Sequence, residues 1–259
     1  MKWVEAEGIE TEEISHNDIL GWIKEHTKRG SSQKTMTGYL AGLKHYFSHL
    51  KASGIIETNP ATNIKLQGIK RKTLYDILAP VELEQLYQNY PATDLRGKVM
   101  TGLLVYQGLK SAEIIRLEVR DIKLRDGIVC IPEGRKNNER TLPLKAQQIL
   151  DLQEYLLTTR KEILNQTRKE SDHLIVSQSQ TGGLGSVLGE LAKKLRKRNR
   201  KVKNLQHLRA SVIVKWLKQY NLREVQYMAG HRYISSTEAY KQNDLDDLIE
   251  EIDKYHPLR

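Results

Sequence analysis

Strand-like patterning is confined to one short part of this 259-residue chain. Three strand-like runs lie at about 121–124, 127–132 and 139–143. The last two flank the sequence GRKNNER, whose glycine and asparagines suit a hairpin turn. These patterns predict a mainly α protein with a small antiparallel β-sheet.

Apolar residues recur at three- and four-residue intervals through most of the remaining chain, which is the helical period. The clearest case is the predicted helix over 33–52, and a shorter one before it is capped by Ser15 or Asn17. The basic stretch GIKRKT at 68–73 is typical of a linker, so we expect a helical unit over residues 1–70 and a second domain over 71–259. In that second domain, helices are predicted at about 80–90, 95–107, 111–117, 144–164, 186–198, 205–220 and 222–229, with a short extended piece at 174–177.

The net charge of +10 and the pI of about 9.5 favour a polyanionic partner, most simply nucleic acid, although a charge that serves only solubility stays open. The densest basic segment is 193–203, which we expect on a DNA-binding face. Its eight cations are Lys193, Lys194, Arg196, Lys197, Arg198, Arg200, Lys201 and Lys203.

The compartment is predicted from cysteine use and hydropathy. The single cysteine, Cys130, excludes an internal disulfide and favours a reducing cytoplasm. No apolar run approaches the ~18 residues that a membrane span requires, so no membrane association is expected.

Residues 225–240, VQYMAGHRYISSTEAY, combine groups that suit phosphoryl transfer without a metal. Tyr240 lies nine residues after His231, and Arg209 precedes both in NLQHLRASVIVKWL. A phenol can attack phosphorus, an imidazole can handle protons, and a guanidinium can hold phosphate oxygens. A tyrosine near the end of a short helix more often serves packing, and it is the joint spacing that favours a DNA-cutting and DNA-joining site.

Five segments carry a resemblance to a known family: YQGLKSAEIIRLEVRDI, IPEGRKNNERTLPL, NLQHLRA, MAGHRYISSTEAY and a terminal segment ending in HPLR. In this order they resemble the tyrosine recombinase (phage integrase) family, with the layout of the short Xer-type enzymes. The resemblance implies an N-terminal helical core-binding domain and a catalytic domain that together clamp double-stranded DNA. It also implies a 3′-phosphotyrosine intermediate, no metal or nucleotide cofactor, a dimer to tetramer on DNA, and a nucleoid-associated enzyme of a mobile element or chromosome.

The resemblance also implies residue roles. Tyr240 matches the nucleophile, His231 the residue that hydrogen-bonds the scissile phosphate, Arg209 the second clamping arginine, and Glu113 an acidic residue that supports the site from behind. At the hairpin tip Arg135 stands where the family has its proton-donating lysine. Because a guanidinium does not readily release a proton, Lys136 is the better chemical candidate.

Two positions depart from the family pattern. Lys110 stands at the first clamping arginine, and Gln206 stands at the histidine three residues before Arg209. His207 does not face the same way on a helix, so it is expected to be an ordinary core or surface histidine. We therefore expect either a recombinase weakened at these positions or, as the alternative, a DNA-binding protein that acts as a regulator or accessory factor. A DNA-relaxing topoisomerase is less favoured, because the front domain is recombinase-like.

The acidic tail carries an apolar stripe of Leu245, Leu248, Ile249 and Ile252. The resemblance implies that this helix docks on a neighbouring subunit, and folding back on its own domain stays the alternative. Residues 1–8 resemble the last turns of the helix with which the family begins, and it stays open whether an initial helix is missing.

Overall fold

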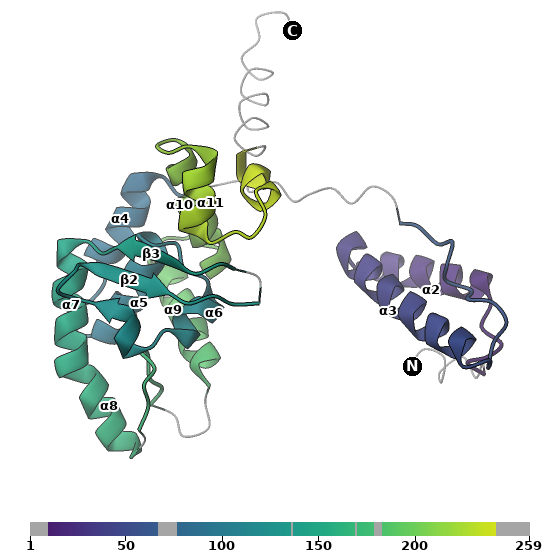
Figure 1. Ribbon diagram of the computed structural model, residues 1–259, viewed down its shortest axis with the longest axis horizontal. Coiled ribbons are helices and arrows are strands. Elements are labelled where there is room, and N and C mark those ends of the chain that lie inside the picture. The colour runs from purple at the N-terminus through teal and green to yellow at the C-terminus, as the bar shows by residue number, and fades with distance from the viewer. Residues whose placement is uncertain (1–9, 67–76, 136, 169, 179–182, 242–259) are drawn as a thin grey trace, which may run out of the picture. The chain divides into compact units, whose positions relative to one another are not determined.

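The computed structural model describes residues 10–66, 77–135, 137–168, 170–178 and 183–241. The chain divides into two compact units, Met1–Lys72 and Thr73–Arg259 (Figure 1). No helix within the described ranges is both long enough and apolar enough to cross a membrane.

The first unit is built on helices α2 (His16–Lys28) and α3 (Gln33–Ala52). Ser15 caps α2 and Ser32 caps α3, each through its hydroxyl, which satisfies backbone amides that have no partner inside a helix. The inward faces of both helices and the segments that precede and follow them form a separate apolar core: Ile14, Ile19, Ile23, Met36, Leu40, Leu43, Phe47, Leu50, Ala61 and Ile64.

The second unit is mainly helical with one small sheet, which confirms the predicted fold class. Its elements are α4 (Pro80–Gln88), α5 (Leu95–Val105), α6 (Ser111–Arg116), the 3₁₀ turn η1 (Val119–Asp121), β1 (Ile122–Lys123), β2 (Ile128–Ile131), β3 (Arg140–Pro143), α7 (Ala146–Leu157), α8 (Thr159–Thr167), α9 (Leu184–Arg198), α10 (Leu205–Leu217) and α11 (Leu222–Ala229).

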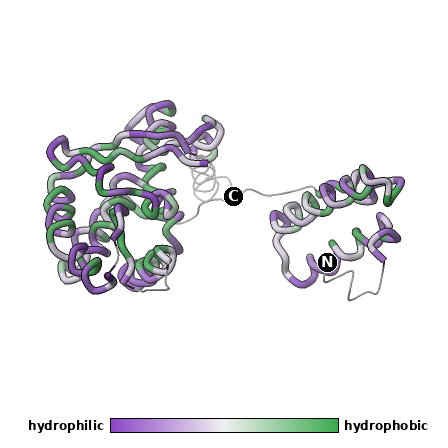
Figure 2. Tube along the Cα trace, turned by 60° about the horizontal axis from the view of Figure 1, so that its bottom comes forward, coloured by the Kyte–Doolittle hydropathy of each residue, from purple (hydrophilic) through white to green (hydrophobic). Residues whose placement is uncertain are grey.

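The sheet has the order β1-β2-β3 and is antiparallel throughout, with Val129 opposite Leu142 at its centre. Helices α5 and α10 are buried along most of their length and pack against each other, so they form the middle of the core. Figure 2 shows apolar segments gathered inside this unit and polar ones around it. Helix α11 packs against both α10 and β3, which brings residues 222–229 to the sheet (Figure 1).

Two sequence predictions are corrected. The helix expected over 144–164 is divided at Thr158, whose hydroxyl donates to the carbonyl oxygen of Glu154 at 2.7 Å, a bond that competes with the helical ladder and bends helices. The extended piece expected at 174–177 bends at 174–175 and forms no strand. It is tied to the fold by the Leu174 amide, which donates to the Leu117 carbonyl oxygen at 2.8 Å, and by Arg96, which donates to the Val176 carbonyl oxygen at 2.9 Å. The expected helix at the start of the chain lies outside the described residues.

Candidate active site

Helix α6 presents two of the predicted site residues at its first turn. Gly108, with φ 57°, turns the chain after α5, and a larger side chain there would crowd Val212 of α10. Lys110 then caps α6, and its backbone amide donates to Oε2 of Glu113 at 2.8 Å. This bond, one half of a capping box, draws the Glu113 carboxylate toward the protein interior while the Lys110 side chain stays half-buried.

Glu113 is paired with an arginine that the sequence reasoning did not single out. Arg140 of β3 donates to both carboxylate oxygens, at 3.0 and 2.9 Å, and both side chains are 0% exposed. Burial raises the pKa of Glu113, but the two Arg140 bonds outweigh burial and the pKa lies below its usual value. The carboxylate is therefore charged and tied to β3.

Arg140 also joins β3 to α11, because its Nε donates to the carbonyl oxygen of Met228 at 2.8 Å. Gly230 makes room for it, since a side chain at that position would overlap the guanidinium. The alternation of the strand could have identified Arg140 in advance, because Arg140 and Leu142 share the buried face of β3. An arginine on that face requires a buried partner.

Arg209 projects from the buried face of α10 and is held by backbone carbonyls from two other segments. Its terminal nitrogens donate to the oxygens of Gly108 and Ala229. One nitrogen also lies 3.3 Å from Nε2 of His231, and the other is 3.8 Å from Oε2 of Glu113. The guanidinium is thus fixed in one orientation before any substrate arrives.

His231 follows the left-handed Gly230 that ends α11, and its ring is buried. Nδ1 lies 2.9 Å from Oγ1 of Thr237, and the ring stacks on Tyr240 with centroids 5.9 Å apart and planes 11° apart. Burial, and then the positive charge of Arg209, lower the pKa of His231 to about 4. The imidazole is therefore neutral near pH 7.

Tyr240 lies on the helical stretch 235–241 and borders an open cavity of about 460 Å³. Burial raises the pKa of its phenol, and the nearby Arg209 opposes part of that rise. The residues that line the cavity are Lys110, Arg135, His231, Arg232, Tyr233, Ser236 and Tyr240. The fold thus gathers the predicted nucleophile, imidazole and two cations around one pocket, with Arg209 and Glu113 directly behind it.

Comparison with known proteins settles the family. The model of the phage integrase family matches residues 76–246. The chain belongs to this family.

Curated relatives of this family member agree over nearly its whole length. It is 28% identical to the tyrosine recombinase XerC of Thermodesulfovibrio yellowstonii, covering 96% of this chain and 85% of that protein. It is 29% identical to the tyrosine recombinase XerD of Oceanobacillus iheyensis, covering 95% and 84%.

Two solved structures share the fold. One is a post-cleavage complex of the XerH site-specific recombinase with a palindromic difH substrate, at TM-score 0.72, 22% identity, and coverage of 93% of this chain and 72% of that one. The other is a lambda integrase dimer bound to a COC′ core site, at TM-score 0.66, 18% identity, and coverage of 89% and 80%.

Not every predicted site residue of this integrase family member reaches the pocket. Gln206 is exposed on the first turn of α10 and is not among the residues that line the cavity. His207 is buried instead, next to the Asn204 cap. Lys136 lies outside the described residues. The site roles assigned to these positions stay predictions.

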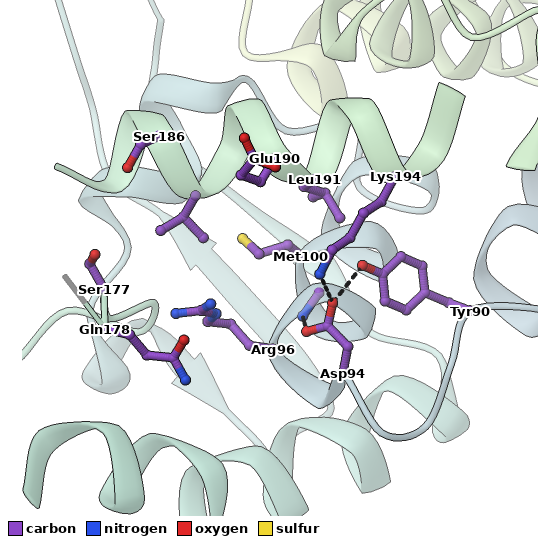
Figure 3. Close-up of a pocket in the computed structure, with 12 residues that line it drawn as sticks. Tyr90, Asp94, Arg96, Met100, Ser177, Gln178, Ser186, Glu190, Leu191 and Lys194 are labelled. Carbon is purple, nitrogen blue, oxygen red and sulfur yellow. Dashed lines mark hydrogen bonds and ion pairs between the residues drawn. The ribbon is translucent and has the colours of Figure 1, made fainter. Parts of the chain in front are cut away.

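The basic segment 193–203 is exposed at all eight cations, but several already have partners within the second unit. Lys194 pairs with Asp94 at 2.7 Å, where Asp94 also accepts from Tyr90 (Figure 3), and Lys201 pairs with Glu82 at 2.9 Å. Lys193 pairs with Glu190 at 2.8 Å, Arg198 lies over the ring of Tyr90, and Arg196 donates to the Lys203 carbonyl. Within the described ranges, Lys197 and Arg200 have no such partner.

The small cavity in Figure 3, of about 200 Å³, lies between α5 and α9 and does not adjoin the Tyr240 pocket. Among the described residues, no group of three or more His, Cys, Asp or Glu side chains gathers in a way that could hold a metal ion.

Proposed function

We propose that this chain is a site-specific DNA recombinase that cuts and rejoins double-stranded DNA through a 3′-phosphotyrosine at Tyr240. The observation that carries the proposal is the pocket itself, where Tyr240, His231 and Lys110 face one open space. The family match and the recombinase relatives support the same activity.

The charge behind the pocket suits a phosphodiester. Arg140 and Arg209 contribute two positive charges and Glu113 one negative charge, so these three groups leave one net positive charge. His231 adds none near pH 7, because the pKa of its ring is about 4. A phosphodiester carries one negative charge, and fixed cations aimed at it stabilise the charge that develops in the transition state.

The proposed step forms one bond and breaks one. The Tyr240 oxygen attacks the scissile phosphorus, the bond from phosphorus to the 5′-oxygen breaks, and a 5′-hydroxyl leaves. Gln206 cannot accept the phenol proton, so that proton passes to solvent through the open pocket. Lys136 donates a proton to the leaving oxygen on chemical grounds, with Arg135 beside it at the pocket. The reverse attack by a 5′-hydroxyl rejoins the strand without a nucleotide, because the bond energy is kept in the phosphotyrosine.

The two departures from the family pattern lower the rate without removing the chemistry. An ammonium at Lys110 supplies charge but not a two-point fork, and an electrostatic donor of this kind is typically worth about 10²–10³ in rate. A missing general base typically costs about 10²–10⁴. Recombination needs few turnovers, so a slowed enzyme still serves. None of the relatives named above favours a protein that only binds DNA.

A covalent trapping experiment tests the activity. The full chain is incubated with a library of nicked duplexes of randomised sequence, in which loss of a short 5′-fragment prevents rejoining. We expect a denaturant-resistant protein–DNA adduct with the wild type and with Tyr220→Phe, a control at an exposed tyrosine outside the pocket. Tyr240→Phe is expected to form none. DNA retained by the wild type without any adduct would instead support the regulator alternative.

Assembly and location extend the same proposal. The enzyme acts as a dimer to tetramer on DNA and stays with the nucleoid in the cytoplasm. The tail stripe that begins at Leu245 lies outside the described residues and is proposed to dock on the neighbouring subunit. Truncation after Gln242 is expected to leave single-site binding nearly intact and to remove higher-order complexes on paired sites. Equal complex formation by both proteins in a gel-shift assay would exclude docking on the neighbour.

A further inference from the structure

Thr237 is a buried hydroxyl beside the active imidazole. Its side chain is 0% exposed, and Oγ1 lies 2.9 Å from Nδ1 of His231. The backbone amide of Thr237 donates a hydrogen bond to the Ile234 carbonyl oxygen at 2.8 Å, so the hydroxyl is held in place by the turn that leads to Tyr240. Family resemblance assigned Thr237 no role.

The partners of the His231 ring decide which nitrogen carries the proton. Nε2 faces Arg209, and a guanidinium only donates hydrogen bonds, so Nε2 must be unprotonated there. A neutral ring then carries its proton on Nδ1, which donates to the Thr237 hydroxyl oxygen. In the DNA-free protein the imidazole therefore presents an acceptor to Arg209.

Three of the four charged groups around this ring act in the same direction. Arg209 from α10, Lys110 from the start of α6 and Arg140 from β3 all disfavour a second proton on the ring, and only Glu113 favours one. Tyr240 covers one ring face. A neutral imidazole with its proton on Nδ1 is the state that all of these neighbours accommodate.

We propose that Thr237 is a positioning residue that lets His231 exchange tautomers when a phosphodiester enters the pocket. The inference rests on the proposed function. A phosphate oxygen only accepts hydrogen bonds, so His231 must carry a proton on Nε2 to donate to it. The proton that leaves Nδ1 and the proton that arrives at Nε2 are exchanged with water of the open pocket, so the ring stays neutral. Arg209 keeps its two carbonyl partners, its Nη2 donates to the phosphate instead of to Nε2, and Nδ1 becomes an acceptor.

A hydroxyl is the group that tolerates this exchange, because it can both accept and donate. Thr237 accepts from the Nδ1 proton before substrate binds and donates to bare Nδ1 afterwards. The ring keeps its position in both states, so the stack on Tyr240 is preserved. A valine at 237 has the same shape but can do neither, and it leaves Nδ1 buried without a partner.

Nitrogen NMR on histidine-labelled full-length protein tests the DNA-free state without requiring any activity. Of the eight histidines, His231 is assigned by the signal that disappears in His231→Gln. At pH 7 we expect a neutral ring protonated on Nδ1 in the wild type and in Thr237→Ser, and an altered tautomer population in Thr237→Val. A wild-type ring protonated on Nε2 would overturn the proposal.

Single-turnover adduct formation on a trapped nicked duplex tests the role in the reaction. Thr237→Val is expected to slow adduct formation by about tenfold to a hundredfold, the usual cost of leaving a buried polar group unpaired, with DNA affinity changed by less than about twofold. Thr237→Ser is expected to react at close to the wild-type rate.

The matched control is Thr101→Val, because Thr101 is also 0% exposed in the second unit but bonds only to Gly97 of its own helix. It is expected to react at the wild-type rate. A wild-type rate for Thr237→Val, or equal slowing by Thr237→Ser, would overturn the inference. Should Thr237→Val fail to fold, Thr237→Ala against Thr237→Ser makes the same comparison. A wild type that forms no adduct contradicts the proposed function, while the NMR result still decides the tautomer.

Discussion

The inner and outer halves of the Tyr240 site are built on opposite principles. The inner cluster, Glu113, Arg140, Arg209 and His231, is buried, and each member has at least two polar partners within the protein. The pocket rim, Lys110, Arg135, Arg232 and Tyr233, is half-buried or exposed. Of its side chains, that of Arg232 has an ion pair, with Glu133 at 2.7 Å.

The difference follows from the cost of burying charge. A buried ion needs its partner in the folded protein, whereas an exposed cation is stabilised by water and can exchange that water for phosphate. The inner cluster is therefore part of the fold and the rim is free to vary. Lys110, the departure that reaches the pocket, lies on the rim.

The largest expected effect comes from breaking the inner cluster. Arg140→Met leaves Glu113 charged, buried and unpaired, and should lower the free energy of unfolding of the second unit by about 3–5 kcal/mol. Adding Glu113→Leu removes the stranded charge and should recover most of that loss. Urea unfolding followed by Trp216 fluorescence, with Trp3 and Trp22 replaced by Phe, reports this unit alone. An Arg140→Met variant with the parent's free energy of unfolding would show that the pair of Arg140 and Glu113 does not stabilise the second unit.

The second effect is a dependence of stability on pH. The folded pKa of His231 is about 4, below its usual 6.5, so between these values the unfolded chain binds more protons than the folded one. This contribution is fully present above pH 6.5 and is lost as the pH falls to 4, which amounts to about 3 kcal/mol. Unfolding measured at pH 7 and pH 4.5 should show a smaller loss in His231→Gln than in the wild type. An equal loss of unfolding free energy in the two proteins would show that the His231 imidazole is not buried in its neutral form.

At the rim we expect a change of rate without a change of stability. Lys110→Arg should speed adduct formation by about tenfold or more, because a planar fork holds two phosphate oxygens, while the free energy of unfolding moves by less than about 0.5 kcal/mol. Gln206→His should restore less, because Gln206 is exposed and is not among the residues that line the pocket. Adduct rates equal for Lys110→Arg and Lys110→Ala would mean that another cation, first of all Arg135, holds the phosphate.

The smallest expected effect concerns the basic segment 193–203, where Lys197 and Arg200 can be compared with Lys194 and Lys201, which have carboxylate partners. Replacing the unpaired Lys197 and Arg200 by alanine should reduce the salt slope of DNA binding by about 0.9 for each phosphate that the protein no longer neutralises. Replacing Lys194 and Lys201 should reduce it less, because Asp94 and Glu82 already neutralise them. Binding measured from low to high salt gives both slopes. Unchanged salt slopes in both double variants would show that this segment does not lie on the DNA-binding face.

Interactions between residues close together in the sequence determined where most helices and strands lie. Ser15, Ser32 and Asn204 all cap helices through their own side chains. Helix α5 ends at Val105, two residues before the expected end, and the left-handed Gly108 turns the chain after it. The strand-like runs paired as the predicted hairpin, because alternation and turn chemistry act over a few residues. The spacing of Tyr240 from His231 was visible for the same reason, since both belong to one short segment.

Tertiary structure alone decided which polar groups that lie far apart in the sequence became partners. Glu113 and Arg140 lie 27 residues apart, and they meet because the fold packs β3 against α11 and brings the Arg140 side chain within hydrogen-bond reach of α6. The hydrogen bond between His231 and Thr237 depends on the turn after Gly230, and the pairing of Lys194 with Asp94 spans 100 residues. Sequence periodicity indicates which face of an element is buried, but a partner is chosen by distance in space, and that distance is set only when the core has packed.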